Sequence, residues 1–263
     1  MGKRHNREAT TEVSKDQSVP MLQPKLHKVS TTKNHTLYNH ALYSKDMAPV
    51  LCIGSAGTGK TFGAIKAAIT QLEEKSIRRI VVIRPQESFA AKAGYLPGTE
   101  REKLEPWIRP IHECLLKLGY SPSQIEYMEK AGVLAYYDLG MIQGLTFDNA
   151  FVLVDECQNM SYEQLRGLLT REGQWSRTVL CGDVAQTSPL FKNSGLPRFL
   201  SMVAAMNAMC HTITMTRDDV VRSEKCKQWI CDFEDFDAGI RLTDYAESAD
   251  TDDPLEELPI YMR

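Results

Sequence analysis

The sequence predicts an α/β fold: a single domain with a mainly parallel sheet and helices on both faces. Short apolar runs, typical of buried parallel strands, alternate along the chain with segments whose apolar residues recur at helical spacing. A glycine-rich loop joins one such strand to one such helix, and two carboxylates directly follow another strand. Open α/β sheets bind their ligands at the carboxyl ends of the strands, so both features predict a site at that end.

The glycine-rich loop has eight residues that fit the pattern G-x-x-x-x-G-K-[ST]: Gly54, Ser55, Ala56, Gly57, Thr58, Gly59, Lys60 and Thr61. Its glycines let the backbone curl so that N–H groups surround a triphosphate. Lys60 is expected to reach the β- and γ-phosphates, and the Thr61 hydroxyl to bind Mg²⁺. Phe62 begins the helix that follows, whose N-terminus adds a positive dipole to the site. We therefore expect ATP and Mg²⁺ as cofactors; the alternative is a glycine-rich turn with a chance lysine.

The other elements follow from the same patterns. Strands are predicted at 50–53, 79–83, 133–137, 151–154, 177–181 and 211–215, where apolar and β-branched residues cluster. Helices are predicted at 34–44, 62–74, 100–118, 122–131, 161–171, 200–209 and 218–229. The third helix is expected to be interrupted near Pro106 and Pro110, and Ser161 to cap the fifth. Glycine and proline make 86–98 irregular.

Two carboxylates, Asp155 and Glu156, directly follow the strand predicted at 151–154. In P-loop proteins an aspartate at this place supports the Mg²⁺ ion. The adjacent Glu156 is the candidate to orient or activate the attacking water. Such an acid pair is a weak signal alone, but about a hundred residues after a P-loop in an alternating β/α chain it indicates a nucleotide-hydrolysing site.

A further polar pair, Asp183 and Gln186, follows the strand predicted at 177–181. A sensor of the γ-phosphate must be a neutral hydrogen-bonding side chain that contacts both the phosphate and the attacking water. Gln186 meets that requirement, although a glutamine in a solvent-facing loop would look the same in the sequence.

The composition is that of a globular protein: 43% of the 263 residues are hydrophobic, 25% are charged, and the net charge is −3. No stretch approaches the roughly 20 apolar residues that span a bilayer, and the polar N-terminus leads into no signal core. The seven cysteines form no C-x-x-C pair, so we expect a reduced, cytoplasmic protein.

The ends of the chain differ in composition from the middle. Residues 1–33 are polar and mostly basic, and residues 241–263 are acidic, so both are predicted to be disordered around a domain at 34–240. The basic arm could contact RNA or DNA, or it could simply be solvated.

Together these motifs resemble the PhoH family of phosphate starvation-inducible-type P-loop ATPases, which are related in sequence to superfamily 1 helicase cores. The resemblance runs from about residue 34 to residue 229 and rests on five stretches: 54–61; 83–85 (Ile-Arg-Pro) with 94–98 (Gly-Tyr-Leu-Pro-Gly); 155–159 (Asp-Glu-Cys-Gln-Asn); 163–165 with 169–171; and 182–186 with 194–196. The second and third are the most specific. The short chain suggests a compact, phage-encoded member that acts in the host cytoplasm.

The resemblance implies a RecA-like core, Mg²⁺-dependent ATP hydrolysis, assembly into hexameric rings and action on RNA. It implies catalytic roles for Lys60, Glu156 and Gln186, and metal support by Thr61 and Asp155.

The chain departs from the family pattern at two places. The family often shows N-Q-x-x-Y, with the glutamine placed for adenine, whereas residues 34–38 here are Asn-His-Thr-Leu-Tyr. His35 thus becomes the candidate to stack on or hydrogen-bond the base. Before the acidic strand the family favours R-G-R-T, whereas residues 143–146 are Gln-Gly-Leu-Thr, with two arginines fewer.

A single lobe predicts a homo-oligomer. A full superfamily 1 helicase has two RecA-like lobes in one chain, so a single-lobe protein must borrow the second from a neighbouring subunit. An arginine finger supplied in trans would then be expected, since such a charge can raise the rate by ~10³-fold or more. Arg84, Arg171 and Arg222 are the candidates, and each could equally form a structural salt bridge.

The leading hypothesis is an oligomeric Mg²⁺-ATPase that binds or remodels RNA or single-stranded nucleic acid and has no membrane contact. One alternative is a small-molecule kinase on the same fold, although the acid pair with Gln186 favours hydrolysis. The other alternative is a nucleotide-switched binding module that recruits a nuclease or chaperone.

Overall fold

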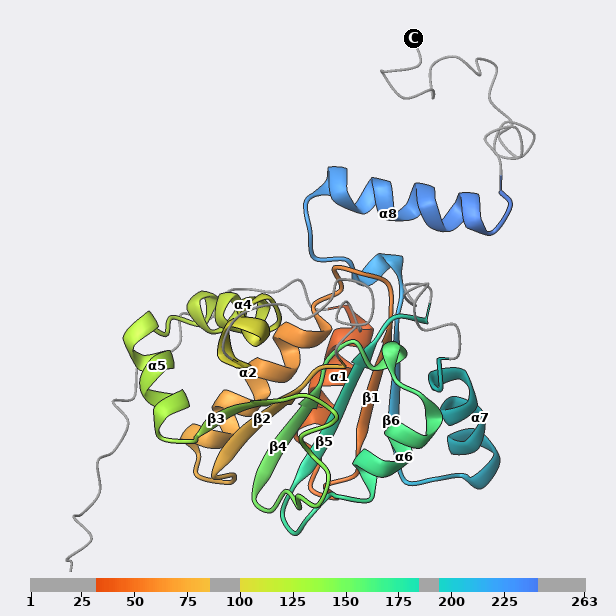
Figure 1. Ribbon diagram of the computed structural model, residues 1–263. Helices are drawn as coiled ribbons and strands as arrows, with labels where there is room; N and C mark the ends of the chain where they lie inside the picture. The colour runs from red at the N-terminus through yellow and green to blue at the C-terminus, as the bar shows by residue number, and fades with distance from the viewer. Residues whose placement is uncertain (1–31, 86–99, 185–193, 241–263) are drawn as a thin grey trace, which may run out of the picture.

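The computed structural model describes residues 32–85, 100–184 and 194–240 (Figure 1). Within them six strands form one parallel sheet in the order β3-β2-β4-β5-β1-β6. The strands are β1 (Val50–Gly54), β2 (Arg79–Ile83), β3 (Leu134–Tyr137), β4 (Ala150–Val154), β5 (Arg177–Gly182) and β6 (His211–Met215). All six lie where they were predicted, and the parallel α/β sheet of a RecA-like fold is confirmed. Almost all of the basic arm, and the whole acidic tail, lie outside the described residues.

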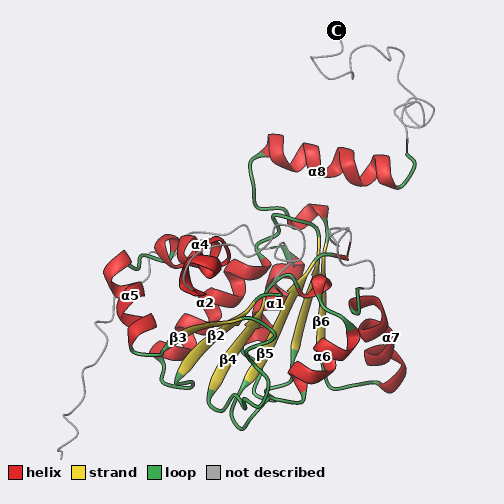
Figure 2. Ribbon diagram, viewed as in Figure 1, coloured by secondary structure: helices red, strands yellow, loops and turns green. Residues whose placement is uncertain are grey.

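Helices cover both faces of the sheet (Figure 2). One face packs against α1 (Lys33–Leu42), α2 (Lys60–Glu73), α4 (Glu100–Lys117) and α5 (Pro122–Lys130), and the other against α6 (Tyr162–Leu169) and α7 (Leu196–Met206). Successive strand residues point to opposite faces: in β4, Phe151 and Leu153 join the first core, and Val152 and Val154 the second. Because both faces are covered, the strand is apolar at every position.

The strand order brings three loops together. The chain leaves β1, forms β2 and β3 on the far side of the sheet, and then returns to place β4 and β5 between β2 and β1. The carboxyl ends of β4, β5 and β1 therefore lie side by side in the middle of the sheet. These are the ends that carry the acid pair, the Gly182-Asp183 step and the glycine-rich loop.

The predicted interruption of the third helix is wrong, because α4 runs without a break from Glu100 to Lys117. A proline inside a helix removes one backbone hydrogen bond and bends the axis. Here Ile111 and Leu115 are buried in the core beside α2. This tertiary packing stabilises the helix more than its two prolines destabilise it.

The helix predicted at 218–229 has the wrong bounds: a 3-10 turn (Arg217–Asp219) comes first, and the helix, α8, runs from Glu224 to Asp237. The Asp219 side chain accepts from the Thr216 backbone N–H at 2.7 Å, which forms a capping box at the start of the turn. Ser223 then caps α8 by accepting from the Cys226 N–H. None of the fourteen residues of α8 is buried, and Figure 1 shows it standing off from the sheet.

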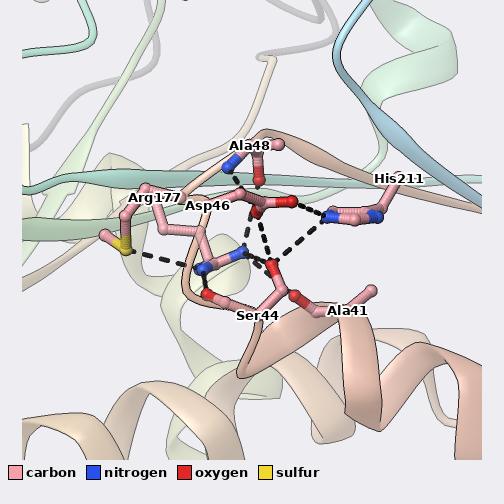
Figure 3. A network of polar contacts seen from close by, with 7 residues as sticks. Ala41, Ser44, Asp46, Ala48, Arg177 and His211 are labelled. Atoms are coloured by element: carbon pink, nitrogen blue, oxygen red, sulfur yellow. Dashed lines mark hydrogen bonds and ion pairs between the residues drawn. The ribbon is translucent and has the colours of Figure 1, made fainter.

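A buried network holds the opposite end of the sheet (Figure 3). Arg177, at the start of β5, donates to the carbonyl oxygens of Ala41 and Ala48, at 3.0 and 3.3 Å, and to that of Ser44. Beside it, His211 Nε2 lies 2.9 Å from the Asp46 carboxylate. One buried guanidinium thus ties the α1–β1 connection to the sheet, on the side away from the glycine-rich loop.

All seven cysteines fall within the described residues and are free thiols. Three of them, Cys52, Cys157 and Cys181, are buried, and burial raises the pKa of Cys181 to about 12. No helix in the described part of the chain is long and apolar enough to cross a membrane.

Candidate nucleotide-binding site

The glycine-rich loop connects β1 to α2 and has the backbone that its sequence predicts. Gly57 and Gly59 have φ values of 74° and 81°, in the left-handed region that favours glycine. Gly54 leaves no room for a side chain, because a Cβ there would lie 1.9 Å from the Met215 carbonyl oxygen of β6. The buried Thr58 hydroxyl donates to the Ser55 carbonyl at 2.9 Å and holds the turn closed.

Lys60 and Thr61 begin α2 and point toward the carboxyl ends of the strands. The Lys60 ammonium curls back over its own loop and donates to the carbonyl oxygens of Gly54 and Ser55 at 2.6 and 2.7 Å. The Thr61 hydroxyl donates to Asp155 Oδ1 at 2.8 Å, which joins the loop to the end of β4.

Asp155 is buried, and burial is the main cause that raises the pKa of its carboxyl, with the nearby Glu156 adding to the rise. Arg84 opposes this rise, with its Nη1 3.8 Å from Asp155 Oδ2. A hydroxyl and a carboxylate in contact offer the hard oxygen ligands that Mg²⁺ takes alongside phosphate oxygens and water. The residues present therefore fit the ion that the glycine-rich loop implies.

Glu156 has an unusual backbone conformation, with φ 57° and ψ 42°. A non-glycine residue in this left-handed region costs free energy, and such residues cluster at functional sites. Two side chains hold its carboxylate: Arg84 Nη2 lies 3.4 Å from Oε1, and Gln158 Nε2 donates to Oε2 at 2.6 Å. Arg84 thus bridges the two acids, and Gln158 holds the second one from its other oxygen.

Gln158 is buried and uses both ends of its amide, because its Oε1 also accepts from the Asp183 N–H at 3.0 Å. It therefore links the end of β4 to the end of β5. The sequence contained it within the Asp-Glu-Cys-Gln-Asn motif but assigned it no role. An amide two residues after the second acid was the only signal.

These groups border a cleft of about 910 Å³. Its lining includes the loop, the acid pair, the first turns of α1 and α2, and part of α4. The predicted site residues Lys60, Thr61, Asp155 and Glu156 meet there. Gln186 lies outside the described residues.

The family model described as PhoH-like protein matches residues 28–234 of the chain. The chain belongs to the PhoH family. The PhoH-like protein of Mycobacterium tuberculosis H37Rv is 37% identical over 174 residues, 66% of this chain and 49% of that protein. Protein PhoH of Escherichia coli K12 is 32% identical over 193 residues, 73% of this chain and 54% of that protein. The chain thus spans about half the length of these curated relatives.

The similar solved structures are more distant. The SWI2/SNF2 ATPase core of Sulfolobus solfataricus, solved with double-stranded DNA, is 10% identical with a TM-score of 0.43, over 73% of this chain and 45% of that one. The Pif1 helicase of Candida albicans is 15% identical with a TM-score of 0.31, over 72% of this chain and 41% of that one. The fold assignment rests on the sheet and the loop, and the family assignment on the sequence match.

In this PhoH protein His35 lies against the glycine-rich loop. Its Nε2 is 2.8 Å from the Thr58 carbonyl oxygen, and its Nδ1 contacts the Thr32 hydroxyl that caps α1. Phe62 and His35 both line the cleft. The residue that departs from the family pattern is therefore at the mouth of the site.

The three arginines predicted as finger candidates fall in two places. Arg84 and Arg222 line the cleft of their own chain. Arg171 follows α6, where its Nε donates to the Ile142 carbonyl at 2.8 Å and its Nη1 to the Gly167 carbonyl at 3.0 Å. Arg171 is not among the residues that line the cleft.

The segment after β6 closes over the glycine-rich loop, which the sequence did not indicate. The Val221 N–H donates to the Gly57 carbonyl at 3.0 Å, and Arg222 packs so closely that a Cβ on Gly57 would lie 2.9 Å from its Nε. Farther along, the Ser55 hydroxyl donates to Glu234 of α8 at 2.5 Å. The candidate site is therefore built from three parts: the strand ends, α1, and the segment leading into α8.

Proposed function

We propose that this PhoH protein is a Mg²⁺-dependent ATPase that couples hydrolysis to the binding or remodelling of RNA or another single-stranded nucleic acid. The observation that supports hydrolysis best is the arrangement at the end of β4. There Asp155 contacts Thr61 of the glycine-rich loop, while Glu156 is held by Gln158 and shares Arg84 with Asp155. Asp155 thus contacts Thr61, the other proposed metal ligand, and Glu156 is held in place for a separate role in activating water.

The roles of the chain's own groups follow from their chemistry. The backbone N–H groups of 54–61 bind the phosphates, and Lys60 Nζ exchanges its two carbonyl partners for phosphate oxygens. Thr61 and Asp155 would hold Mg²⁺, which when bound neutralises charge on the β- and γ-phosphates. Glu156 orients the attacking water and accepts its proton.

Two further roles are part of the proposal. Gln186 contacts the γ-phosphate and the attacking water, as a neutral hydrogen-bonding group can. His35, at the mouth of the cleft, binds the base of the nucleotide by stacking or by a hydrogen bond.

We also propose that the protein works as a homo-oligomeric ring, a hexamer, in the cytoplasm, which is the host cytoplasm if the chain is phage-encoded. A subunit that supplies an arginine in trans should lose turnover when that arginine is replaced. Activity should return when this variant is mixed with Lys60→Ala subunits, because some interfaces then combine an intact site with an intact finger. Arg84→Ala, Arg171→Ala and Arg222→Ala, each mixed in this way, identify the residue.

The first test of function is phosphate release by the purified protein, with and without single-stranded RNA or DNA. Lys60→Ala should abolish binding and turnover, whereas Glu156→Gln should bind ATP and turn over at least about 10²-fold more slowly. Stimulation by one polymer, lost in both variants, identifies the nucleic acid. If Glu156→Gln hydrolyses ATP like the wild type, the proposed catalytic role is wrong.

One contact favours a second candidate, the nucleotide-switched binding module. Glu234 joins the exposed helix α8 directly to the phosphate-binding loop at Ser55. A Glu156→Gln protein that still supports the function in cells would favour this module, since nucleotide binding without hydrolysis would then be enough for the function. Transfer of phosphate to an added small molecule, in place of release, would instead indicate a kinase.

A further inference from the structure

Arg84 bridges the two carboxylates of the acid pair. It directly follows β2, which pairs in parallel with β4, so Arg84 stands beside Asp155 at the carboxyl edge of the sheet. Its Nη1 is 3.8 Å from Asp155 Oδ2, and its Nη2 is 3.4 Å from Glu156 Oε1. A planar guanidinium can reach two acids at once in this way, whereas an ammonium is a single point of charge.

The remaining oxygen of each carboxylate has a neutral partner. Asp155 Oδ1 accepts from the Thr61 hydroxyl at 2.8 Å, and Glu156 Oε2 accepts from the Gln158 amide at 2.6 Å. Among the ion pairs of the described residues, Arg84 is the one cation that contacts these two acids. The protein itself therefore balances part of their negative charge.

Arg84 and a divalent ion compete for the same carboxylate. Asp155 is the proposed ligand of Mg²⁺, so this inference rests on the proposed function. Like charges repel, and the repulsion grows where burial excludes solvent. Asp155 is buried, and the Arg84 side chain is only 23% exposed. With Arg84 in place, Asp155 therefore binds a divalent ion less tightly than it would alone.

A bound nucleotide offers Arg84 other partners. Arg84 lines the same cleft as Lys60 and the rest of the glycine-rich loop. Hydrogen bonds from a guanidinium to phosphate oxygens are among the strong ones in proteins and are frequently bidentate. When Arg84 turns from the acid pair to a phosphate, it releases the Asp155 oxygen that it faces.

We propose that Arg84 makes the binding of the divalent ion depend on the nucleotide. Without nucleotide, its guanidinium bridges the acid pair and disfavours the ion. With nucleotide, it binds phosphate within its own chain and leaves Asp155 to the ion. The two ligands then bind cooperatively, and each raises the affinity for the other by the same factor.

The first experiment measures the affinity of the full chain for Mn²⁺ without nucleotide, from the electron paramagnetic resonance signal of the free ion. Mn²⁺ takes the same oxygen ligands as Mg²⁺. Arg84→Met should bind Mn²⁺ about tenfold more tightly than the wild type, or better, because the cation beside Asp155 is gone. Arg84→Lys keeps the charge and should bind nearly as weakly as the wild type. Arg78→Met, at an exposed arginine just before β2, is the matched control and should not differ from the wild type.

The second experiment measures the affinity for a fluorescent ATP analogue in EDTA, so that no metal is present. Arg84→Met should bind the analogue about threefold to tenfold more weakly, because the phosphates lose a cation. Arg78→Met should again match the wild type. The two effects of Arg84→Met have opposite signs, whereas a misfolded variant would lose affinity for both ligands.

Three results would overturn the proposal. Arg84→Met could bind Mn²⁺ no more tightly than the wild type, or it could bind the metal-free analogue just as tightly. Alternatively, mixing with Lys60→Ala subunits could restore hydrolysis to Arg84→Met, which would show that Arg84 acts on a neighbouring subunit. If the wild type released no phosphate but both titrations gave the expected shifts, the proposed hydrolysis would fail and the role of Arg84 would stand.

Discussion

At the scale of single residues, the acid pair shows how one strand end gives two neighbouring carboxylates different surroundings. Asp155 is buried against Thr61, whereas Glu156 is more exposed, has a left-handed backbone and is held by Gln158. The difference comes from the backbone and from one buried amide, because the two residues are neighbours in sequence. In the proposed mechanism Gln158 is therefore a positioning residue that acts through Glu156.

Gln158→Met is expected to lower kcat by roughly 10-fold to 10²-fold with little change in KM, because Glu156 loses its 2.6 Å partner. Methionine keeps most of the volume but leaves the Asp183 N–H without its acceptor, at a cost of about 1–3 kcal/mol in stability. Steady-state ATP hydrolysis and nucleotide affinity measure the two effects separately. Gln143→Met, at an exposed glutamine, is the control. A parallel loss of nucleotide affinity would argue against a positioning role.

Asp155→Asn is expected to stabilise the metal-free protein near neutral pH while abolishing Mg²⁺-dependent hydrolysis. Burial raises the folded-state pKa of Asp155, so the ionised form is less stable in the folded protein than in the unfolded chain. Its favourable contribution is complete below the ordinary aspartate pKa and is lost as pH rises through the raised value. Asparagine avoids this loss and still accepts from Thr61.

Thermal unfolding without metal, from about pH 4 to about pH 8, measures that difference. The midpoint of the wild type should fall relative to Asp155→Asn as pH rises. Asp237→Asn, at an exposed position of α8, is the control and should show no such divergence. Equal midpoints at every pH would contradict the assignment.

At the scale of elements, the sequence predicted best where one local pattern decided the structure. The six strands are apolar runs buried on both faces, and the glycine-rich loop is dictated by its own backbone. The sequence predicted worst where contacts between distant parts of the chain decide the structure. Core packing keeps α4 unbroken through two prolines, and Asp219 caps a turn with help from Thr32 and Asn34, nearly two hundred residues earlier.

The contact between α8 and the glycine-rich loop is of the same kind, since its two residues are 179 positions apart. It places the Glu234 carboxylate beside the loop that is expected to bind phosphates. A carboxylate and a phosphate repel each other, so this contact should oppose nucleotide binding. Glu234→Gln keeps an acceptor for Ser55 and removes the charge.

Glu234→Gln is therefore expected to tighten the binding of Mg²⁺–ATP and ADP by about 3-fold to 10-fold. The effect is modest because the Glu234 side chain is partly exposed, so solvent screens its charge. Titration with a fluorescent ADP analogue at two salt concentrations measures it, because screening should shrink the difference at high salt. Asp232→Asn, on the same helix but not in contact with the loop, is the control. Unchanged or weaker binding would show that the Glu234 charge does not oppose the nucleotide.

At the scale of the whole molecule, the two ends of the sheet have different roles. The carboxyl ends of β1, β4 and β5 carry the groups of the proposed nucleotide site, and the sequence located them because their motifs are local. The amino ends carry the Arg177 network, which the sequence did not reveal, because its acceptors are backbone carbonyls of another segment. An arginine in an apolar strand gives no hint of which carbonyls it binds.

This division predicts that stability and activity can be changed separately. Arg177→Met should leave nucleotide affinity and kcat nearly unchanged, because the network lies at the end of the sheet opposite the cleft. It should cost about 3 kcal/mol, since the buried carbonyls of Ala41, Ser44 and Ala48 lose their donor. For a domain of this size that corresponds to a fall of roughly 6–12 °C in Tm. Arg166→Met, at an exposed arginine of α6, should change neither quantity. Arg177→Met could instead weaken nucleotide binding at temperatures where the variant is fully folded. The two ends of the sheet would then be coupled. The path between them would be the α1–β1 connection, because α1 also carries His35.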